Sequence, residues 1–396
     1  MEMRHLLYLA TCLFLLNSCT KENIDGTPSL NPELPEVAYD YKNITLPFNA
    51  VPGLVQINTR IDFINIDPFS NPIFTGGFIN NPGGIKQEIT DEGATLGRVL
   101  FYDKSLSQNN TISCASCHQQ KLAFTDGKAF SEGFQGELTE RNSMSIINPI
   151  LQNNLFWDSR SVSILDLSLK PIQNHIEMGM ERLDILEEKV RNIDYYGPLF
   201  EKAFGDRHIT SDRIAVAISQ FVSSITSSNS KFDKGQLNTF ELHGKQVFLE
   251  KCGSCHSGSN FAADDGPGGA YGMNFIDLSS TSIVNLRGTT NIGLDVVSAD
   301  NGFDGKFRIP TLRNIMLTAP YMHDGRFKTI DEVLDHYSSG IKPNANLDVK
   351  FKTPDGKVKF ISLSDAERLA LKAFLAALTD ETMLTDPKYS DPFRRR

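Results

Sequence analysis

The sequence has no dense run of lysine and arginine, and its formal net charge at neutral pH is −9. Binding to nucleic acid requires a cationic surface that meets the phosphates, so we expect no nucleic-acid partner. An acidic chain instead suits a basic protein partner, because opposite electrostatic fields raise the encounter rate. The 40% hydrophobic content over 396 residues is that of a globular protein, and this length allows two or three domains.

The apolar run near the start of the chain, Leu6 to Leu16, is too short to cross a bilayer as a helix. It follows the positive stretch Arg4-His5, and this order predicts a signal peptide over residues 1–18. The run ends in Leu16-Asn17-Ser18-Cys19, which resembles a bacterial lipobox with Cys19 as the lipidated residue. Ordinary signal-peptide cleavage is the alternative. We expect a periplasmic or cell-envelope lipoprotein whose only membrane attachment is the lipid.

Cysteine is scarce, and four of the six cysteines form two similar motifs, while Cys12 and Cys19 lie in the targeting segment. The motifs are Cys114-Ala115-Ser116-Cys117-His118 and, 138 residues later, Cys252-Gly253-Ser254-Cys255-His256. The C-x-x-C-H order is that of a covalently attached haem, in which both thiols form thioethers and the histidine binds iron. A thioredoxin-like pair or half of a zinc ribbon also uses C-x-x-C, but neither requires the histidine. Two haems in two domains are therefore predicted.

The order of elements around the two motifs is similar. A helix is predicted from Thr90 to Tyr102, directly before the first motif, and another, carrying Leu242, Val247 and Phe248, before the second. The proline-rich residues 19–87 predict a tether and an irregular extension, and the serine-rich residues 223–230 a domain boundary. Further helices are expected over 161–169, 180–191, 211–223 and, behind the capping box that starts at Ser364, through Leu371, Phe374, Leu375 and Leu378.

From about Thr90 to Asp380 the chain resembles the bacterial di-haem cytochrome c peroxidases and the related MauG-type enzymes. The resemblance is carried by the two haem motifs together with Phe156-Trp157-Asp158, Ile176-Glu177-Met178-Gly179, Pro310-Thr311-Leu312-Arg313-Asn314 and Thr318-Ala319-Pro320-Tyr321-Met322-His323-Asp324-Gly325. It implies a mainly α fold of two cytochrome c-like domains, each with a covalently bound haem. Residues 88–230 would form the N-terminal peroxidatic domain and residues 231–396 the C-terminal electron-transfer domain.

The resemblance assigns catalytic roles to two residues. Trp157 is the only tryptophan, and the matching indole of the family lies between the haems as an electron relay. Glu177 matches the distal glutamate of the family, a base that moves a proton from the near oxygen of peroxide to the far one. The alternatives are a core tryptophan with a bonded N–H and a solvated glutamate.

The open face of the first haem is inferred from missing histidines. Many members of the family carry a sixth-ligand histidine in the segment that matches residues 130–141, and this chain has no histidine between His118 and His175. We expect a five-coordinate first iron that is open to peroxide. Pro171 matches a distal-pocket proline of the MauG-type relatives, and His175 is either a modifier of the pocket or the sixth ligand after all.

Tyr337 stands 14 residues after His323, at the position where the peroxidases place an axial methionine. It falls on the apolar face of the helix predicted from Ile330, so it points inward, whereas His336 points elsewhere. The resemblance implies that Tyr337 binds the second iron opposite His256, with a simple core tyrosine as the alternative. Phenolate favours ferric and higher iron, which brings the chain closer to the MauG type.

The resemblance also implies a calcium ion between the domains. Asn142 would give a side-chain oxygen, and Thr318 and Pro320 would give backbone carbonyls. Calcium accepts such neutral oxygens, with waters completing its shell.

The function predicted from these residues is a di-haem c-type peroxidase, an oxidoreductase that reduces hydrogen peroxide to water with electrons from a c-type cytochrome or another small redox protein. One alternative is a MauG-like oxidase that uses stored oxidising equivalents to modify a partner protein. A non-enzymatic electron carrier, with both irons six-coordinate, is the other. A homodimer is left open as the oligomeric state.

Overall fold

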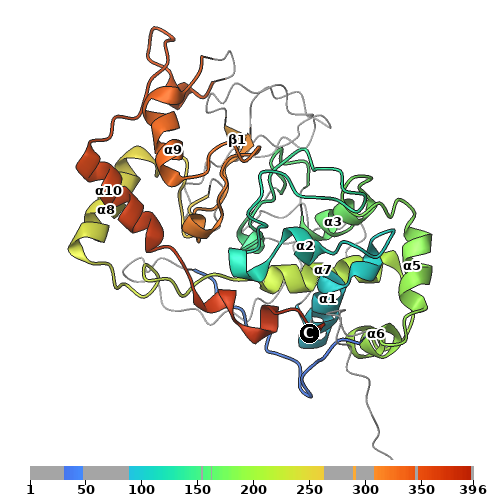
Figure 1. Cartoon of the computed structure of the whole chain (residues 1–396). Helices are drawn as coiled ribbons and strands as arrows, with labels where there is room; N and C mark the ends of the chain where they lie inside the picture. The colour runs from blue at the N-terminus through green and yellow to red at the C-terminus, as the bar shows by residue number, and fades with distance from the viewer. Residues whose placement is uncertain are drawn as a thin grey trace, which may run out of the picture.

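The computed structural model describes residues 31–47, 89–152, 155–161, 163–262, 289–290, 307–343 and 347–393. Most regular structure in these ranges is helical, and the strands there are the short antiparallel pair β1 Thr289–Thr290 and β2 Phe307–Arg308 (Figure 1). The predicted mainly α fold is confirmed. The predicted signal peptide, Cys19 and most of the predicted extension lie outside the described residues. No helix in the described ranges is both long and apolar enough to cross a membrane.

The first helical unit is built on α1 Asp91–Tyr102, which packs against α7 Ser211–Ser224. Both helices match their predicted ranges. Thr90 caps α1 by accepting a hydrogen bond from the Gly93 amide, and acidic residues in the first turn favour the helix dipole. The two axes approach closely because Gly97 has no side chain: a Cβ there would lie 1.9 Å from the Ala217 carbonyl oxygen.

The other helices of this unit are short. They are α2 Cys114–Cys117, α3 Ile164–Ser168, α4 Lys170–Gln173, α5 Leu183–Arg191 and α6 Tyr196–Phe204. The single helix predicted over 161–169 is wrong in its extent, because α3 begins only at Ile164, where Ser163 supplies the cap, and α4 follows it directly. The helix predicted over 180–191 begins three residues late, at Leu183.

The second unit repeats the arrangement of the first. Its helix α8 Thr239–Lys251 runs into the second haem motif and packs against α10 Asp365–Ala376, whose capping box at Ser364 was predicted. A Cβ on Gly244 would lie 1.9 Å from the Ala370 carbonyl oxygen. This is the same distance as that between a Cβ on Gly97 and the Ala217 carbonyl oxygen in the first unit. The predicted stripe at the end of the chain, Leu371, Phe374, Leu375 and Leu378, is buried, whereas Leu242 is exposed.

The segment between α8 and α10 contains α9 Ile330–Asp335, which continues into a π-helical turn over His336–Gly340. Single turns of 3-10 helix are η1 Lys104–Leu106, η2 Gln120–Leu122, η3 Pro149–Leu151, η4 Ile315–Leu317, η6 Val349–Phe351, η7 Thr382–Leu384 and η8 Pro387–Tyr389.

Each unit has its own hydrophobic core. The serine-rich connection between them is not a solvated linker, because Ser227 is fully buried and exchanges hydrogen bonds with the side chain of Asn148. The end of the chain returns to the first unit, where Met383, Tyr389 and Phe393 join the first core (Figure 1). The division into residues 88–230 and 231–396 stays a prediction, and the final segment belongs by its packing to the first core.

Candidate haem centres

The first C-x-x-C-H motif is carried by α2, and His118 follows this helix directly. The Nδ1 atom of His118 lies 2.9 Å from the carbonyl oxygen of Phe124. A carbonyl only accepts, so Nδ1 carries the proton and Nε2 keeps the lone pair that a metal requires. Burial lowers the pKa of His118, which keeps the imidazole neutral.

An unusual backbone conformation directs the Phe124 carbonyl towards His118. Ala123 and Phe124 both have left-handed φ values, 50° and 61°, which are unfavourable for residues with a side chain. The Phe124 ring is fully buried, with its centroid 6.3 Å from that of Phe101 and 6.2 Å from that of Tyr389. Burial of this ring offsets the cost of the conformation, and the carbonyl oxygen is thereby fixed on the imidazole.

The second motif repeats this device. Nδ1 of His256 lies 3.1 Å from the carbonyl oxygen of Phe261, whose φ is 52°. The Phe261 ring packs against Phe248 and Phe374, with centroids at 5.5 and 5.9 Å. Burial lowers the pKa of His256 to about 4, although hydrogen bonds to the carbonyls of Phe261 and Pro310 act in the opposite direction.

Neither phenylalanine was predicted from the sequence as part of a haem centre. The available signal was a phenylalanine six residues after His118 and another five residues after His256. This spacing indicates nothing about function until the left-handed backbone that turns each carbonyl is known.

The four cysteines of the two motifs are free thiols and are half-buried. Burial raises the pKa of Cys114 and Cys252 to about 12 and that of Cys117 to about 11, so these thiols stay protonated at neutral pH. Among the residues that the structure describes, no group of three or more His, Cys, Asp and Glu side chains gathers as a metal site.

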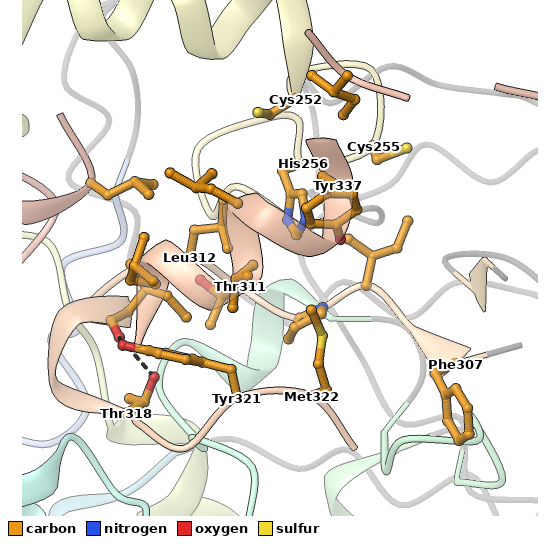
Figure 2. A pocket seen from close by; sticks show the side chains of 18 of the residues that line it. Cys252, Cys255, His256, Phe307, Thr311, Leu312, Thr318, Tyr321, Met322 and Tyr337 are labelled. Carbon is orange, nitrogen blue, oxygen red and sulfur yellow. Dashed lines mark hydrogen bonds between the residues drawn. The ribbon is translucent and has the colours of Figure 1, made fainter. Parts of the chain in front are cut away.

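A cavity of about 680 Å³ opens beside the second motif. Its size falls within the range of about 300–1,000 Å³ that is usual for cofactor pockets. Its lining includes Cys252, Cys255, His256 and Tyr337, which Figure 2 labels. Trp157 and Asn142 also line it. The two thiols, the imidazole and a cavity thus occur together, and the residues fit a covalently bound haem.

Tyr337 projects into this cavity near His256, as Figure 2 shows. Its ring stacks on Phe351, with centroids 5.9 Å apart, and burial raises the pKa of its phenol. The regular helical face predicted from Ile330 is wrong in one respect: α9 ends at Asp335 and Tyr337 lies in the π turn. Turns of π-helix are rare in proteins, and those that occur are often found at functional sites.

Glu177 lies close to the first motif. Its negative charge contributes to the raised pKa of both Cys114 and Cys117, and burial raises the pKa of Glu177 itself against the opposing effect of Arg160. The main chain is held from two sides. The side chain of Asn174 accepts the Glu177 amide at 3.2 Å, and the Glu177 carbonyl accepts the Phe134 amide at 3.0 Å.

The other two residues predicted for the distal pocket lie in different environments. Pro171 is half-buried in the first turn of α4. His175 is exposed and lines a second cavity of about 610 Å³, together with Phe134 and Gly179. His175 therefore lies at the second cavity and is exposed, whereas Glu177 is half-buried.

Trp157 lies at the junction of the two units. Its indole N–H donates to the main-chain oxygen of Asn142 at 2.9 Å, and its own carbonyl accepts the Arg308 amide at 2.7 Å. The ring is half-buried, lines the large cavity and lies 6.5 Å from the imidazole of His323, centroid to centroid. The tryptophan thus joins a segment of the first unit to the second site.

The three predicted calcium ligands, Asn142, Thr318 and Pro320, line the same cavity. Asn142 is held by three hydrogen bonds: its amide donates to the His323 carbonyl at 2.7 Å, its carbonyl accepts Trp157, and its Nδ2 donates to the Lys128 carbonyl at 2.8 Å. Oδ1 is the atom predicted to bind calcium. These neutral oxygens fit calcium, which binds amide and carbonyl oxygens readily.

Comparison with known proteins gives consistent results. A family model described as di-haem cytochrome c peroxidase matches residues 91–239. The cytochrome c551 peroxidase of Nitrosomonas europaea is 32% identical over 249 residues, which cover 61% of this chain and 71% of that protein. The methylamine utilization protein MauG of Methylophilus methylotrophus is 29% identical over 307 residues, 75% of this chain and 85% of the relative.

Solved structures of similar proteins come from the same group of di-haem proteins. The crystal structure of a MauG-like protein associated with microbial copper homeostasis has a TM-score of 0.65 and 31% identity, covering 83% of this chain and 99% of that one. The di-haem peroxidase BthA of Burkholderia thailandensis has a TM-score of 0.58 at 20% identity, covering 79% and 93%, and shows the shared fold.

Proposed function

The chain belongs to the family of di-haem cytochrome c peroxidases and MauG proteins, and on this premise we propose that it reduces hydrogen peroxide to water at the first haem centre. As a member of this family it is an oxidoreductase with two c-type haems. The haems would supply the redox chemistry. The electrons would come from a c-type cytochrome or a similar small redox protein.

The observation that carries the proposal is the position of Glu177 beside the first motif, with its pKa raised by burial. A carboxyl group of this kind accepts and returns a proton near neutral pH more readily than an ordinary glutamate. Glu177 would take the proton from the near oxygen of peroxide and deliver it to the far oxygen, which leaves as water when the O–O bond breaks. Two electrons from the donor and two protons from solvent would convert the near oxygen into the second water.

The residues of the first motif would hold and orient the haem. Cys114 and Cys117 would form the two thioethers, and His118 would present Nε2 to the iron because Phe124 holds its Nδ1–H. At the second centre Cys252 and Cys255 would form the thioethers, and His256 and Tyr337 would hold the iron.

Trp157 would relay electrons between the two centres. The hydrogen bond from its indole N–H to the Asn142 carbonyl, at 2.9 Å, orients the ring. We further propose that calcium binds Asn142, Thr318 and Pro320 and holds this junction. Pro171 would border the distal pocket, and His175 would influence it only from the neighbouring cavity.

A MauG-like oxidase that modifies a partner protein is the second candidate function, and Tyr337 is the observation that favours it. Tyr337 lies with His256 in the large cavity, and a phenolate ligand would make the second centre a poor acceptor from an ordinary cytochrome c. Steady turnover with reduced cytochrome c and peroxide would support the first candidate. Absence of turnover, with a long-lived oxidised state, would support the second.

The test of the proposed function is Glu177→Gln, with the exposed Glu181→Gln as the matched control. The first variant should retain both haems but react with peroxide about 10²–10⁴-fold more slowly, as is typical when a general base is removed. The control should react at the rate of the parent protein. Equal peroxide rates in the parent and Glu177→Gln would remove this residue from the mechanism.

We place the protein outside the cytoplasm, as a periplasmic or cell-envelope lipoprotein, because of the predicted signal peptide and Cys19. Replacing Cys19 by alanine should release the protein from membranes, and continued membrane association would contradict the lipid anchor.

A further inference from the structure

The second haem motif is followed by a loop whose three consecutive carbonyls each accept a bond from a different side chain. The Ser259 carbonyl accepts Nε of Arg313 at 2.8 Å, and the Asn260 carbonyl accepts the Thr311 hydroxyl at 2.5 Å. The third carbonyl, that of Phe261, is 3.1 Å from Nδ1 of His256. The acceptor for the proximal imidazole therefore lies at the end of a loop that is fixed on two sides.

Arg313 is itself held rigidly. Its guanidinium forms a two-point ion pair with Asp233, at 2.8 and 2.9 Å, and the Arg313 side chain is fully buried. It also lies over the Phe261 ring, with Cζ 5.6 Å from the ring centroid. A buried Arg–Asp pair with two parallel bonds has a defined geometry, so it transmits a fixed position to whatever else the arginine touches.

Phe261 needs such support because of its left-handed φ of 52°. A non-glycine residue keeps this conformation only where the surroundings over-determine it. Relaxation of Phe261 towards ordinary values would turn its carbonyl away from His256. Burial of the ring and the two bonded neighbours oppose this relaxation.

The first centre is held differently. There the neighbouring carbonyl, that of Ala123, accepts the Ser145 hydroxyl at 2.7 Å, and the Phe124 carbonyl accepts His118. The Ser145 hydroxyl corresponds to the Thr311 hydroxyl of the second centre. The carbonyl one residue earlier, that of Leu122, accepts the neutral Thr125 hydroxyl at 2.9 Å, where the second centre uses the charged Arg313. The buried Arg313–Asp233 ion pair is thus a feature of the second centre.

We infer that Arg313 and Thr311 are positioning residues that hold the Phe261 carbonyl on the imidazole N–H of His256 and thereby set the reduction potential of the second haem. This inference rests on the proposed function, because it assumes a haem iron on His256. A bonded N–H makes the imidazole more electron-rich and favours ferric iron. A weaker bond should therefore favour the reduced haem.

The test uses one double and one single variant of the full-length, haem-loaded protein. Arg313→Gln with Asp233→Asn removes both charges, so that no unpaired charge is left buried. Thr311→Val removes the bond to the Asn260 carbonyl and changes no charge. The matched control is Arg213→Gln, because Arg213 also makes a two-point pair, with Asp206, and also bonds a loop carbonyl, that of His208, but on the surface of the first unit.

The readouts are haem content, the reduction potential of each haem and the iron–histidine stretching frequency by resonance Raman spectroscopy. Both test variants should shift the reduction equilibrium of the second haem about tenfold towards the reduced form, which is about 59 mV for a one-electron couple. They should also lower its iron–histidine frequency. The first haem, and both haems of the control, should be unchanged.

An unchanged second-haem potential in both test variants, at full haem content, would overturn the inference while leaving the proposed function intact. An equal shift in both haems, or in the control, would also overturn it. If the double variant does not fold, Thr311→Val decides alone. Absence of a haem on His256 in the parent protein would instead refute the proposed function.

Discussion

The indole nitrogen of Trp157 donates to the main-chain oxygen of Asn142 at 2.9 Å. The only tryptophan is therefore anchored on a residue that we propose as a calcium ligand. Loss of the ion would affect the ring through a single bond. The structure thus connects a proposed metal site to the orientation of the proposed electron relay.

Removal of calcium should therefore impair electron transfer. Chelation should change the emission of Trp157 and slow steady turnover by roughly tenfold to 10²-fold, because small displacements of a redox or reacting group are costly. Both changes should reverse when calcium, but not magnesium, is added back, since magnesium requires a smaller octahedral site. Unaltered emission and turnover in protein shown to be free of calcium would contradict the predicted link.

The pH dependence of the peroxide reaction should report on Glu177. Burial raises the pKa of this group above its ordinary value of 4.5, and peroxide activation needs the carboxylate form. The rate constant for the reaction with peroxide should fall as the pH decreases through a midpoint above 4.5, and Glu177→Gln should lack this titration. A profile that is identical in the parent protein and the variant would assign the titration to another group.

The same raised pKa predicts a pH dependence of stability. The folded protein binds the Glu177 proton more tightly than the unfolded chain does, so the contribution of this group is fully present below 4.5 and is lost as pH rises through the folded-state pKa. The difference in the free energy of unfolding between the parent and Glu177→Gln should therefore decrease as the pH rises from 4.5 through the folded-state pKa. Denaturant unfolding at several pH values measures it, and a constant or increasing difference would oppose the assigned direction.

Tyr337→Met should raise the reduction potential of the second haem by on the order of 0.1 V, a fraction of the roughly 0.8 V that axial ligands span. The first haem should not change. Tyr321→Phe is the control, because Tyr321 lines the same cavity but donates its hydroxyl to the Ile315 carbonyl at 3.0 Å. A redox titration of Tyr337→Met that superimposes on that of the parent would show that the phenol is not on iron.

Gly244→Ala should destabilise the second unit by about 1–3 kcal/mol, the usual cost of overpacking. The new Cβ would lie 1.9 Å from the Ala370 carbonyl, so α8 and α10 would have to separate. Gly197→Ala in α6 is the control, since its Cβ would meet only Cδ of Arg207 at 3.5 Å. That substitution should be neutral or stabilising by up to about 1 kcal/mol. Thermal unfolding compares the two, and equal stability would contradict the close helix packing.

The features that could be predicted from the sequence are those written in contiguous residues. The two haem motifs, the cap at Thr90 and the capping box at Ser364 are local, and they identified the helices around each motif. The apolar spacing after Ser364 likewise identified the buried face of the last helix. The mainly helical fold followed from these signals, and the family from the resemblance that the haem motifs and the other ordered motifs carry.

The features that were missed depend on distant residues or on unusual backbone. The Arg313–Asp233 pair joins positions 80 residues apart, and no local pattern indicates it. The left-handed conformation of Phe124 and Phe261 is stabilised by the rings around them, which come from other helices. The π turn that carries Tyr337 escaped a prediction based on regular helical spacing.

Central to the proposed function is an open face on the haem iron beside Glu177, while the other iron is held by His256 and Tyr337. The most direct measurement is the spin-state spectrum of the resting ferric protein by electron paramagnetic resonance, before and after one equivalent of peroxide. We predict a high-spin signal from the first haem that disappears with peroxide, together with a low-spin signal from the second. Two low-spin, six-coordinate haems that do not respond to peroxide would contradict this assignment.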